Sequence, residues 1–219
     1  MTTPLSGLVF DLDGTLADTL PVCFHAYRTV FARFLGQSFT DGEIAGLFGP
    51  NEEGIIRHVV PDRWEEALGR YLAEYQQAHV RFARKIPGVK EVLGSLRERG
   101  VPLAVVTGKG AESARISLGL LGLARYFDCV ETGSAEGSIK AFGLRQVLAR
   151  WRVPPEAVAY VGDASADILA AKEVGVLSVA AAWAVGADSA LLSSHQPRFL
   201  FTTVGEFSDW VRSQFEIRR

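Results

Sequence analysis

Short apolar runs that end in polar residues recur along the chain and predict buried strands. The runs are Leu8–Phe10, Leu103–Val106, Val158–Val161 and Val176–Ala182. They are rich in small and β-branched residues and are apolar on both faces, which is typical of parallel strands covered by helices. We therefore predict that these segments form one parallel sheet.

Helical patterns lie between the later strands and end at glycine. Residues Val89–Arg99 precede Gly100, and Ile168–Val174 precede Gly175. Glycine is favoured there because it adopts the left-handed conformation that closes a helix. The alternation of strands and helices from Pro87 onward predicts a doubly wound, Rossmann-like α/β core.

The stretch from Ala17 to Arg84 has helical spacing and no strand-like run. Its aromatic and apolar side chains recur at helical intervals in two sets, Phe24/Tyr27/Phe31/Phe34 and Trp64/Leu68/Tyr71/Leu72/Tyr75. A capping box from Thr40 to Glu43 predicts the start of a short helix. We predict two domains: a core of residues 1–16 and 86–219, and a small all-helical cap of residues 17–85. An insert at this point would cover the carboxyl ends of the strands, where α/β folds bind ligands.

The bulk composition narrows the choice of partners. The 219 residues carry a formal net charge of -2, which gives no reason to expect nucleic acid or an anionic membrane as a partner. The chain opens without a signal-peptide pattern and has no apolar run of bilayer length, so we expect a cytoplasmic protein. Cys23 and Cys129 are far apart and predict no disulfide, and we expect both to be buried apolar side chains.

Asp11 and Asp13 follow the first predicted strand and carry the first candidate chemistry. At positions i and i+2 of an extended chain, both carboxylates project to the same side. They repel each other unless a cation lies between them or one stays protonated. A divalent cation would let Asp11 approach a phosphate as a nucleophile, and a protonated Asp13 could act as general acid and then as base. Alternatively, Asp11 and Asp13 belong to a turn with a purely structural role, since aspartates are common in turns that follow a strand.

Two further segments contain residues that are candidates for binding phosphate. Thr107 and Gly108 follow a predicted strand and precede a helix, and a hydroxyl beside free amides can cradle a phosphate. Lys140 precedes a helix, where a positive charge opposes the helix dipole, so an anionic partner would explain its position. Thr107 could instead be a helix cap, and Lys140 a surface lysine.

Two aspartates after the strand Val158–Val161 are candidates for metal binding. Asp163 lies at the strand end, and with Asp11 it could supply hard oxygen ligands for Mg²⁺. Asp167 lies in the first turn of the next helix, where a carboxylate also interacts favourably with the helix dipole. For Asp167, the sequence leaves the functional and the structural interpretation equally open.

Together these segments resemble the four motifs of the haloacid dehalogenase (HAD) superfamily of phosphohydrolases. The similarity covers Phe10–Thr19, Val105–Lys109, Lys140 and Val161–Asp167, in the order found in that family. It is closest to the phosphoglycolate-phosphatase-like branch, which has an α-helical cap after the first motif. One departure is that Ala141 and Phe142 follow Lys140, where relatives usually have prolines.

The resemblance implies a Mg²⁺-dependent phosphomonoester hydrolase for a small phosphorylated metabolite. It implies that Asp11 forms an aspartyl-phosphate and that Asp13 is the general acid and then the base. The implied metal ligands are Asp11, the backbone carbonyl of Asp13 and Asp163, with Asp167 in a supporting position. The implied ligands of the phosphoryl group are Thr107, the Gly108 amide and Lys140.

Other functions stay open at this stage. A dehalogenase does not need Asp13, and phosphonate hydrolysis in the family uses a cap lysine, which residues 17–84 lack. A beta-phosphoglucomutase-like sugar-phosphate mutase or a pyrophosphatase would keep the same core. A catalytically idle module that binds a phosphorylated ligand predicts the loss of a motif aspartate, and all of them are present. The substrate and the oligomeric state, monomer or dimer, are not decided by the sequence.

Overall fold

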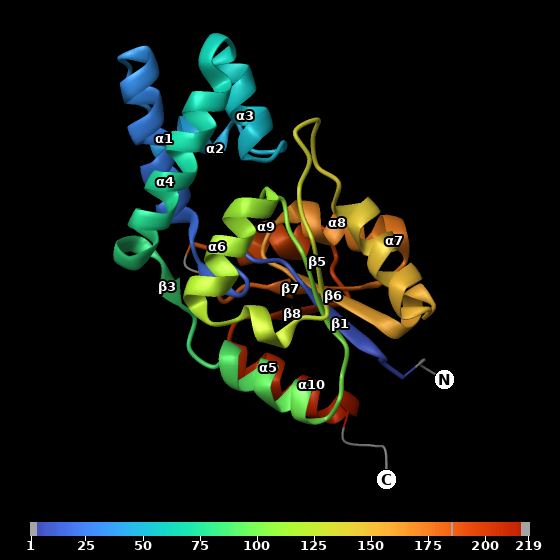
Figure 1. Cartoon of the computed structure of the whole chain (residues 1–219). Helices are drawn as coiled ribbons and strands as arrows, with labels where there is room; N and C mark the ends of the chain where they lie inside the picture. The colour runs from blue at the N-terminus through green and yellow to red at the C-terminus, as the bar shows by residue number, and fades with distance from the viewer. Residues whose placement is uncertain (1–3, 185, 216–219) are drawn as a thin grey trace.

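A parallel six-stranded sheet forms the centre of the molecule in the computed structural model, which describes residues 4–184 and 186–215. The strands are β1 (Gly7–Phe10), β4 (Leu103–Val106), β5 (Cys129–Glu131), β6 (Val158–Gly162), β7 (Leu177–Ala181) and β8 (Phe199–Phe201). Their spatial order is β5-β4-β1-β6-β7-β8, and all neighbours are parallel (Figure 1). The predicted Rossmann-like α/β fold is confirmed, although the sequence did not predict the two short edge strands β5 and β8.

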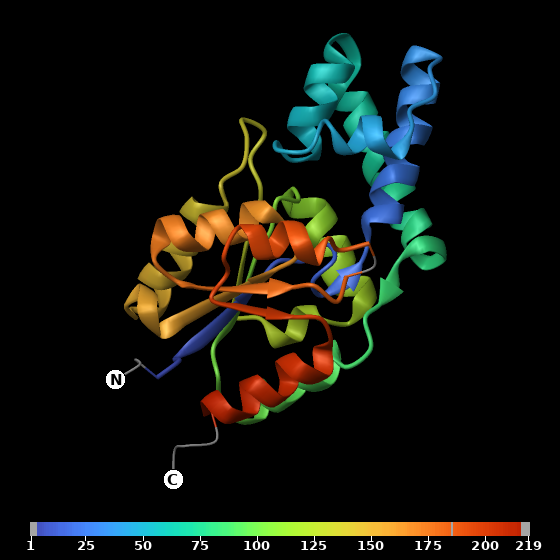
Figure 2. The ribbon, with the colours of Figure 1, turned by 180° about the vertical axis from the view of Figure 1, so that it is seen from behind.

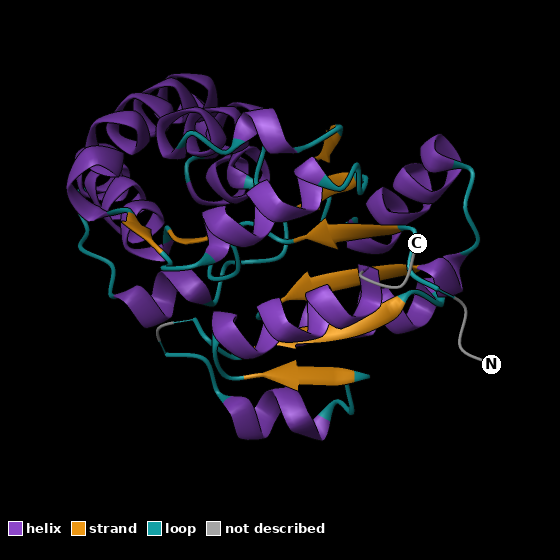
Figure 3. Ribbon diagram, turned by 90° about the horizontal axis from the view of Figure 1, so that it is seen from below, coloured by secondary structure: helices purple, strands orange, loops and turns teal. Residues whose placement is uncertain are grey.

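Helices cover both faces of this sheet (Figure 3). They are α5 (Val89–Glu98), α6 (Ala111–Leu121), α7 (Lys140–Trp151), α8 (Ser165–Val174), α9 (Ser189–Ser194) and α10 (Val204–Phe215). Leu8 and Phe10 of β1 pack on the face covered by α5, α6 and α10, while Val9 packs on the face covered by α7 and α8. This alternation explains why the strands are apolar on both faces.

The four helices α1 (Leu20–Leu35), α2 (Asp41–Ala45), α3 (Glu52–Val59) and α4 (Trp64–Phe82) form a separate group beside the sheet (Figures 1 and 2). They have a core of their own, which includes the fully buried Tyr27, Phe31 and Tyr75. The predicted capping box is present, because Thr40 and Glu43 each accept a hydrogen bond from the backbone of the other. The helical content agrees with an inserted cap, and the division at residues 16/17 and 85/86 stays a prediction.

Two short segments connect the helical group to the sheet. The strands β2 (Ala17–Asp18) and β3 (Arg84–Lys85) pair with each other in antiparallel orientation. The expectation that residues 17–84 contain no strand was therefore wrong at its edges, since a pair of two-residue strands leaves no periodic pattern. The described residues also form three short 3₁₀ helices, at Pro61–Arg63, Ala124–Tyr126 and Pro155–Ala157.

The described part of the chain contains no helix with the length and apolar character needed to cross a bilayer. Both cysteines are free thiols, as predicted. Cys23 is buried, but Cys129 is only half-buried. The expectation that both would be buried was wrong for Cys129 because it lies on β5, at the edge of the sheet.

Candidate active site

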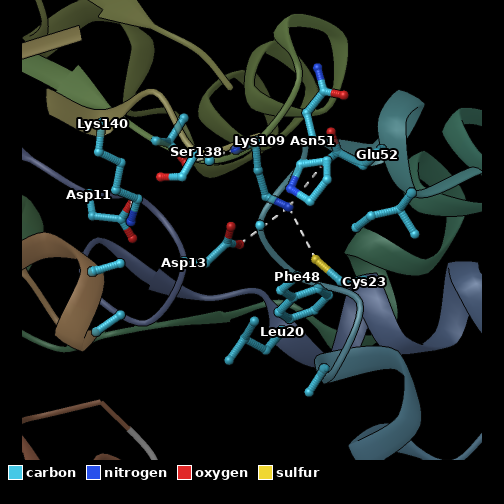
Figure 4. A pocket seen from close by; sticks show the side chains of 18 of the residues that line it. Asp11, Asp13, Leu20, Cys23, Phe48, Asn51, Glu52, Lys109, Ser138 and Lys140 are labelled. Atoms are coloured by element: carbon cyan, nitrogen blue, oxygen red, sulfur yellow. Dashed lines mark hydrogen bonds and ion pairs between the residues drawn. The ribbon is translucent and has the colours of Figure 1, made fainter. Parts of the chain in front are cut away.

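A cavity of about 440 Å³ lies between the carboxyl ends of the strands and the helical group. Figure 4 shows that side chains from both parts of the molecule point into it. The residues predicted from the sequence that line it are Asp11, Asp13, Thr107, Gly108, Lys140 and Asp163. Asp167 lies directly behind them. The structure therefore brings together every predicted site residue at one end of the sheet.

Asp11 lies at the floor of the cavity, directly after β1. Its backbone N–H donates to the carbonyl of Val161 at 2.8 Å, which fixes the turn to the neighbouring strand. The residue is only 4% exposed, and the Lys140 ammonium lies 3.2 Å from its Oδ1. Burial raises the pKa of Asp11 well above its ordinary value, and Lys140 opposes this shift. Burial therefore disfavours the ionised form of Asp11, and a neighbouring positive charge favours it.

Asp163 approaches Asp11 from the end of β6. One carboxylate oxygen from each of Asp11, Asp163 and Asp167 lies within 4.8 Å of the others. The Thr15 hydroxyl donates to Asp163 Oδ1 at 3.1 Å. Burial, and then the charge of Asp167, raises the pKa of Asp163 to about 7. Three acidic groups at this separation are suited to a divalent cation, which would offset their repulsion.

Gly14 allows the loop after β1 to lie against Asp163. Its φ of +80° falls in the left-handed region, and a Cβ atom there would lie 2.0 Å from Asp163 Oδ2. No side chain fits at that distance, so glycine is required both for the backbone conformation and for the close approach.

Asp167 is held by the protein on both of its carboxylate oxygens. Its Oδ1 accepts hydrogen bonds from Lys140 at 2.5 Å and from the Tyr160 hydroxyl at 2.7 Å. Its Oδ2 accepts one from the backbone N–H of Ala164 at 3.0 Å. Gly162 leaves room for this carboxyl group, since a Cβ there would lie 2.3 Å from Asp167 Cγ. Tyr160 lies inside an apolar strand, so no sequence pattern indicates its role.

Thr107 lies in the loop between β4 and α6 and is 2% exposed. Its Oγ1 accepts a hydrogen bond from the backbone N–H of Lys109 at 3.3 Å. The N-cap of α6 is Gly110, which makes no side-chain capping bond. Thr107 therefore does not cap the helix, which removes the structural alternative considered from the sequence.

Lys109 is a second buried lysine of the site, and its sequence context predicts no role for it. It is 4% exposed, and its Nζ lies 3.3 Å from Asp13 Oδ1 and donates to Cys23 Sγ at 3.1 Å. Although burial disfavours its charge, Asp13 raises the pKa of Lys109 above its ordinary value. Asp13 also accepts a hydrogen bond from the Thr19 hydroxyl. The dashed lines in Figure 4 show how Lys109 joins the loop after β4 to α1.

Glu52 joins α3 to the start of α6. Glu52 is 6% exposed, and its Oε2 accepts a hydrogen bond from the backbone N–H of Gly110 at 2.5 Å. Its Oε1 accepts from the Ser113 hydroxyl at 2.5 Å and lies 3.8 Å from Lys109 Nζ. The only hint in the sequence is that Lys109 directly follows Thr107 and Gly108, which are candidate phosphate ligands.

The comparisons with known proteins agree with this geometry. The family model described as haloacid dehalogenase-like hydrolase matches residues 8–181. A PpaX protein of Caldanaerobacter subterraneus subsp. tengcongensis, named among the pyrophosphatases, is 32% identical over 183 residues, which cover 83% of each chain. A phosphoglycolate phosphatase of Synechococcus elongatus is 28% identical over 87% of this chain and 90% of its own.

A crystal structure from Haemophilus somnus, titled as a predicted phosphoglycolate phosphatase, superposes with a TM-score of 0.82. The match covers 96% of this chain and 100% of the other at 20% identity, so it supports the fold alone. The family model covers most of the chain, and the PpaX relative is similar over the same region. The chain is therefore a hydrolase that belongs to the haloacid dehalogenase-like family.

Proposed function

We propose that the chain is a Mg²⁺-dependent phosphomonoester hydrolase that acts on a small phosphorylated metabolite through an aspartyl-phosphate on Asp11. The observation that carries this proposal is the convergence of Asp11, Asp13 and Asp163 with Lys140 on one cavity. The names of the relatives, pyrophosphatase and phosphoglycolate phosphatase, support the cleavage of a phosphoryl bond and differ in the leaving group.

The acidic residues that face the cavity fit a hard divalent cation. Asp11, Asp163 and the backbone carbonyl of Asp13 would hold Mg²⁺. Asp167 would support them, because its own oxygens are occupied by Lys140, Tyr160 and the backbone. The bound ion would neutralise charge on the carboxylates and on the phosphoryl oxygens.

The first half of the reaction transfers the phosphoryl group to Asp11. A carboxylate oxygen of Asp11 attacks phosphorus, and the bond from phosphorus to the leaving oxygen breaks. Asp13 donates a proton to that oxygen, so the leaving group departs as a neutral alcohol. Lys140, Thr107 and the Gly108 amide stabilise the phosphoryl oxygens, whose charge is greatest in the transition state.

The second half returns the enzyme to its starting state. Asp13, now ionised, takes a proton from a water molecule, and the water oxygen attacks the phosphorus of the aspartyl-phosphate. The bond between phosphorus and the Asp11 oxygen breaks and releases inorganic phosphate. The contact of Lys109 with Asp13 positions this carboxylate between the cavity floor and the helical group.

The experiment is a release assay for inorganic phosphate, with a generic aryl phosphate as substrate, with and without Mg²⁺. We expect turnover that requires Mg²⁺ and is lost in Asp11→Asn. Asp209→Asn is the matched control, because Asp209 lies on the exposed side of α10. Stable phosphate binding without any turnover would overturn the proposal in favour of the idle binding module.

We also propose that residues 17–85 act as a cap that opens and closes over the site. Support comes from the paired segments β2 and β3 at its base and from the Glu52 contact with the start of α6. Closure would exclude water while the aspartyl-phosphate forms.

A further inference from the structure

The part of the cavity that faces the leaving group is mainly apolar. The phosphoryl group would lie against Asp11 and Lys140, so the rest of the substrate must extend past Asp13 towards the helical group. Figure 4 shows Leu20, Cys23 and Phe48 on that side. The large aliphatic and aromatic side chains of the helical group that line it, here named the cap face, are Leu20, Phe24, Tyr27, Phe48, Ile55 and Tyr71.

The cations of the cavity are already paired. Among the described residues, Lys109 and Lys140 are the basic side chains that line it. Lys140 lies 3.2 Å from Asp11 and 2.5 Å from Asp167. Lys109 lies 3.3 Å from Asp13 and 3.8 Å from Glu52. Among the described residues that line the cavity, no unpaired cation is therefore available to an additional negative charge on the leaving group. Such a charge would also be repelled by the Glu52 carboxylate.

The cost of placing a charge there is large compared with the gain from an apolar group. An ion that leaves water without a partner loses its solvation without compensation, whereas an apolar group is stabilised in proportion to the surface that it buries. The cavity volume of about 440 Å³ lies in the range of sites that enclose drug-sized ligands. The cavity therefore has room for a leaving group with several carbon atoms.

We propose that the substrates are phosphate monoesters whose leaving group is neutral and largely apolar, such as an aryl or branched alkyl alcohol. The inference rests on the proposed phosphatase function and narrows its substrate class. The proposed substrates differ from those in the names of the relatives, because phosphoglycolate and pyrophosphate both have anionic leaving groups. Phe24 and Phe48 stack with ring centroids 5.9 Å apart and an interplanar angle of 3°, which gives the cap face a flat wall for a ring.

The test compares two esters that differ in one charge. Benzyl phosphate and 4-carboxybenzyl phosphate have similar leaving alcohols, so the ratio of their kcat/KM values reports the cavity and not the intrinsic reactivity. With the full chain and Mg²⁺, we expect benzyl phosphate to be preferred by at least about tenfold. Phosphoglycolate and pyrophosphate should be poorer still. A ratio of one or below, or faster turnover of either anionic metabolite, would overturn the inference.

A charge placed on the cap face tests the same idea from the side of the protein. Phe48→Lys adds a cation next to the expected leaving group and should shift the ratio towards the carboxylated ester by at least about tenfold. Val80→Lys is the matched control, because Val80 is an apolar residue of the same helical group, 85% exposed and outside the cavity lining. It should leave the ratio unchanged. An equal shift in both variants, or no shift in Phe48→Lys, would contradict the role of the cap face.

These outcomes are distinguishable from a failure of the proposed function. The ratio within one enzyme is independent of how much of each variant folds. If neither ester nor any other phosphate is hydrolysed with Mg²⁺, the phosphatase proposal is wrong. If hydrolysis occurs but favours the charged esters, only the substrate class is wrong.

Discussion

The raised pKa of Asp163 predicts that the metal-free protein loses stability as the pH rises from about 4 to about 7. The carboxyl group titrates near its ordinary value of 3.8 in the unfolded chain and near 7 in the folded protein. Between these values the folded state binds more protons than the unfolded state, so a rise in pH favours unfolding. The favourable contribution is complete below the lower value and is lost once the pH passes the upper one.

The size of the effect follows from the shift. About three pH units correspond to an upper bound of about 4 kcal/mol. Asp163 is partly accessible to solvent, which screens the neighbouring charges, so we expect about 2 kcal/mol. The raised pKa of Asp11 acts in the same direction. Burial lowers the pKa of His79, so this residue makes the protein more stable as the pH rises. The wild type must therefore be compared with a variant that also contains His79.

The assay is urea unfolding followed by circular dichroism at pH values from about 4.5 to 7.5, in EDTA, for the wild type and Asp163→Asn. The free energy of unfolding of the wild type, measured relative to the variant, should fall by about 2 kcal/mol across this range. At the upper pH, Mg²⁺ at one hundred times its dissociation constant should raise the free energy of unfolding of the wild type by about 2.7 kcal/mol. The increase should be smaller for the variant. A difference between the two proteins that does not change with pH would refute the reasoning.

Three further changes test separate parts of the site. Lys140→Met should lower kcat/KM by at least about a hundredfold, because it removes the cation beside the nucleophile, and phosphate release measures this. Glu52→Gln should weaken the contact between α3 and α6, raise KM more than it lowers kcat, and accelerate proteolysis of the helical group. Gly162→Ala should cost about 2 to 4 kcal/mol in urea unfolding, since its Cβ would lie 2.3 Å from Asp167 Cγ. Gly119→Ala, at a helix position with nothing within 4 Å, is its control and should not destabilise the protein.

The fold and the convergence of the predicted site residues on one cavity could be predicted because both depend on short stretches of sequence. An apolar run fixes a buried strand, and the carboxyl ends of parallel strands meet at one edge of the sheet. Asp11, Thr107 and Asp163 therefore had to converge once their strands were identified. Edge strand β8 was missed because three residues are too few to show a periodic pattern.

The contacts between the helical group and the sheet could not be predicted in the same way. Glu52 lies 57 positions before Lys109 along the chain, and their approach depends on how α3 packs over α6. No local pattern specifies that packing. Both residues instead have ordinary local interpretations, Glu52 as a favourable charge in the first turn of α3 and Lys109 as a loop lysine. Their burial together is visible only in the folded molecule.

The balance of charge around the cavity gives a physical reason why the proposed reaction would need a cation. Among the described residues, seven acidic and basic side chains surround the phosphoryl site. They are the carboxylates Asp11, Asp13, Glu52, Asp163 and Asp167 and the ammonium groups Lys109 and Lys140. If all are ionised, negative charges exceed positive ones by three, and a phosphate dianion is repelled. One divalent cation and one proton, which the proposed mechanism places on Asp13, cancel that excess. The cation and the proton that the proposed mechanism requires would thus also remove the repulsion of the substrate.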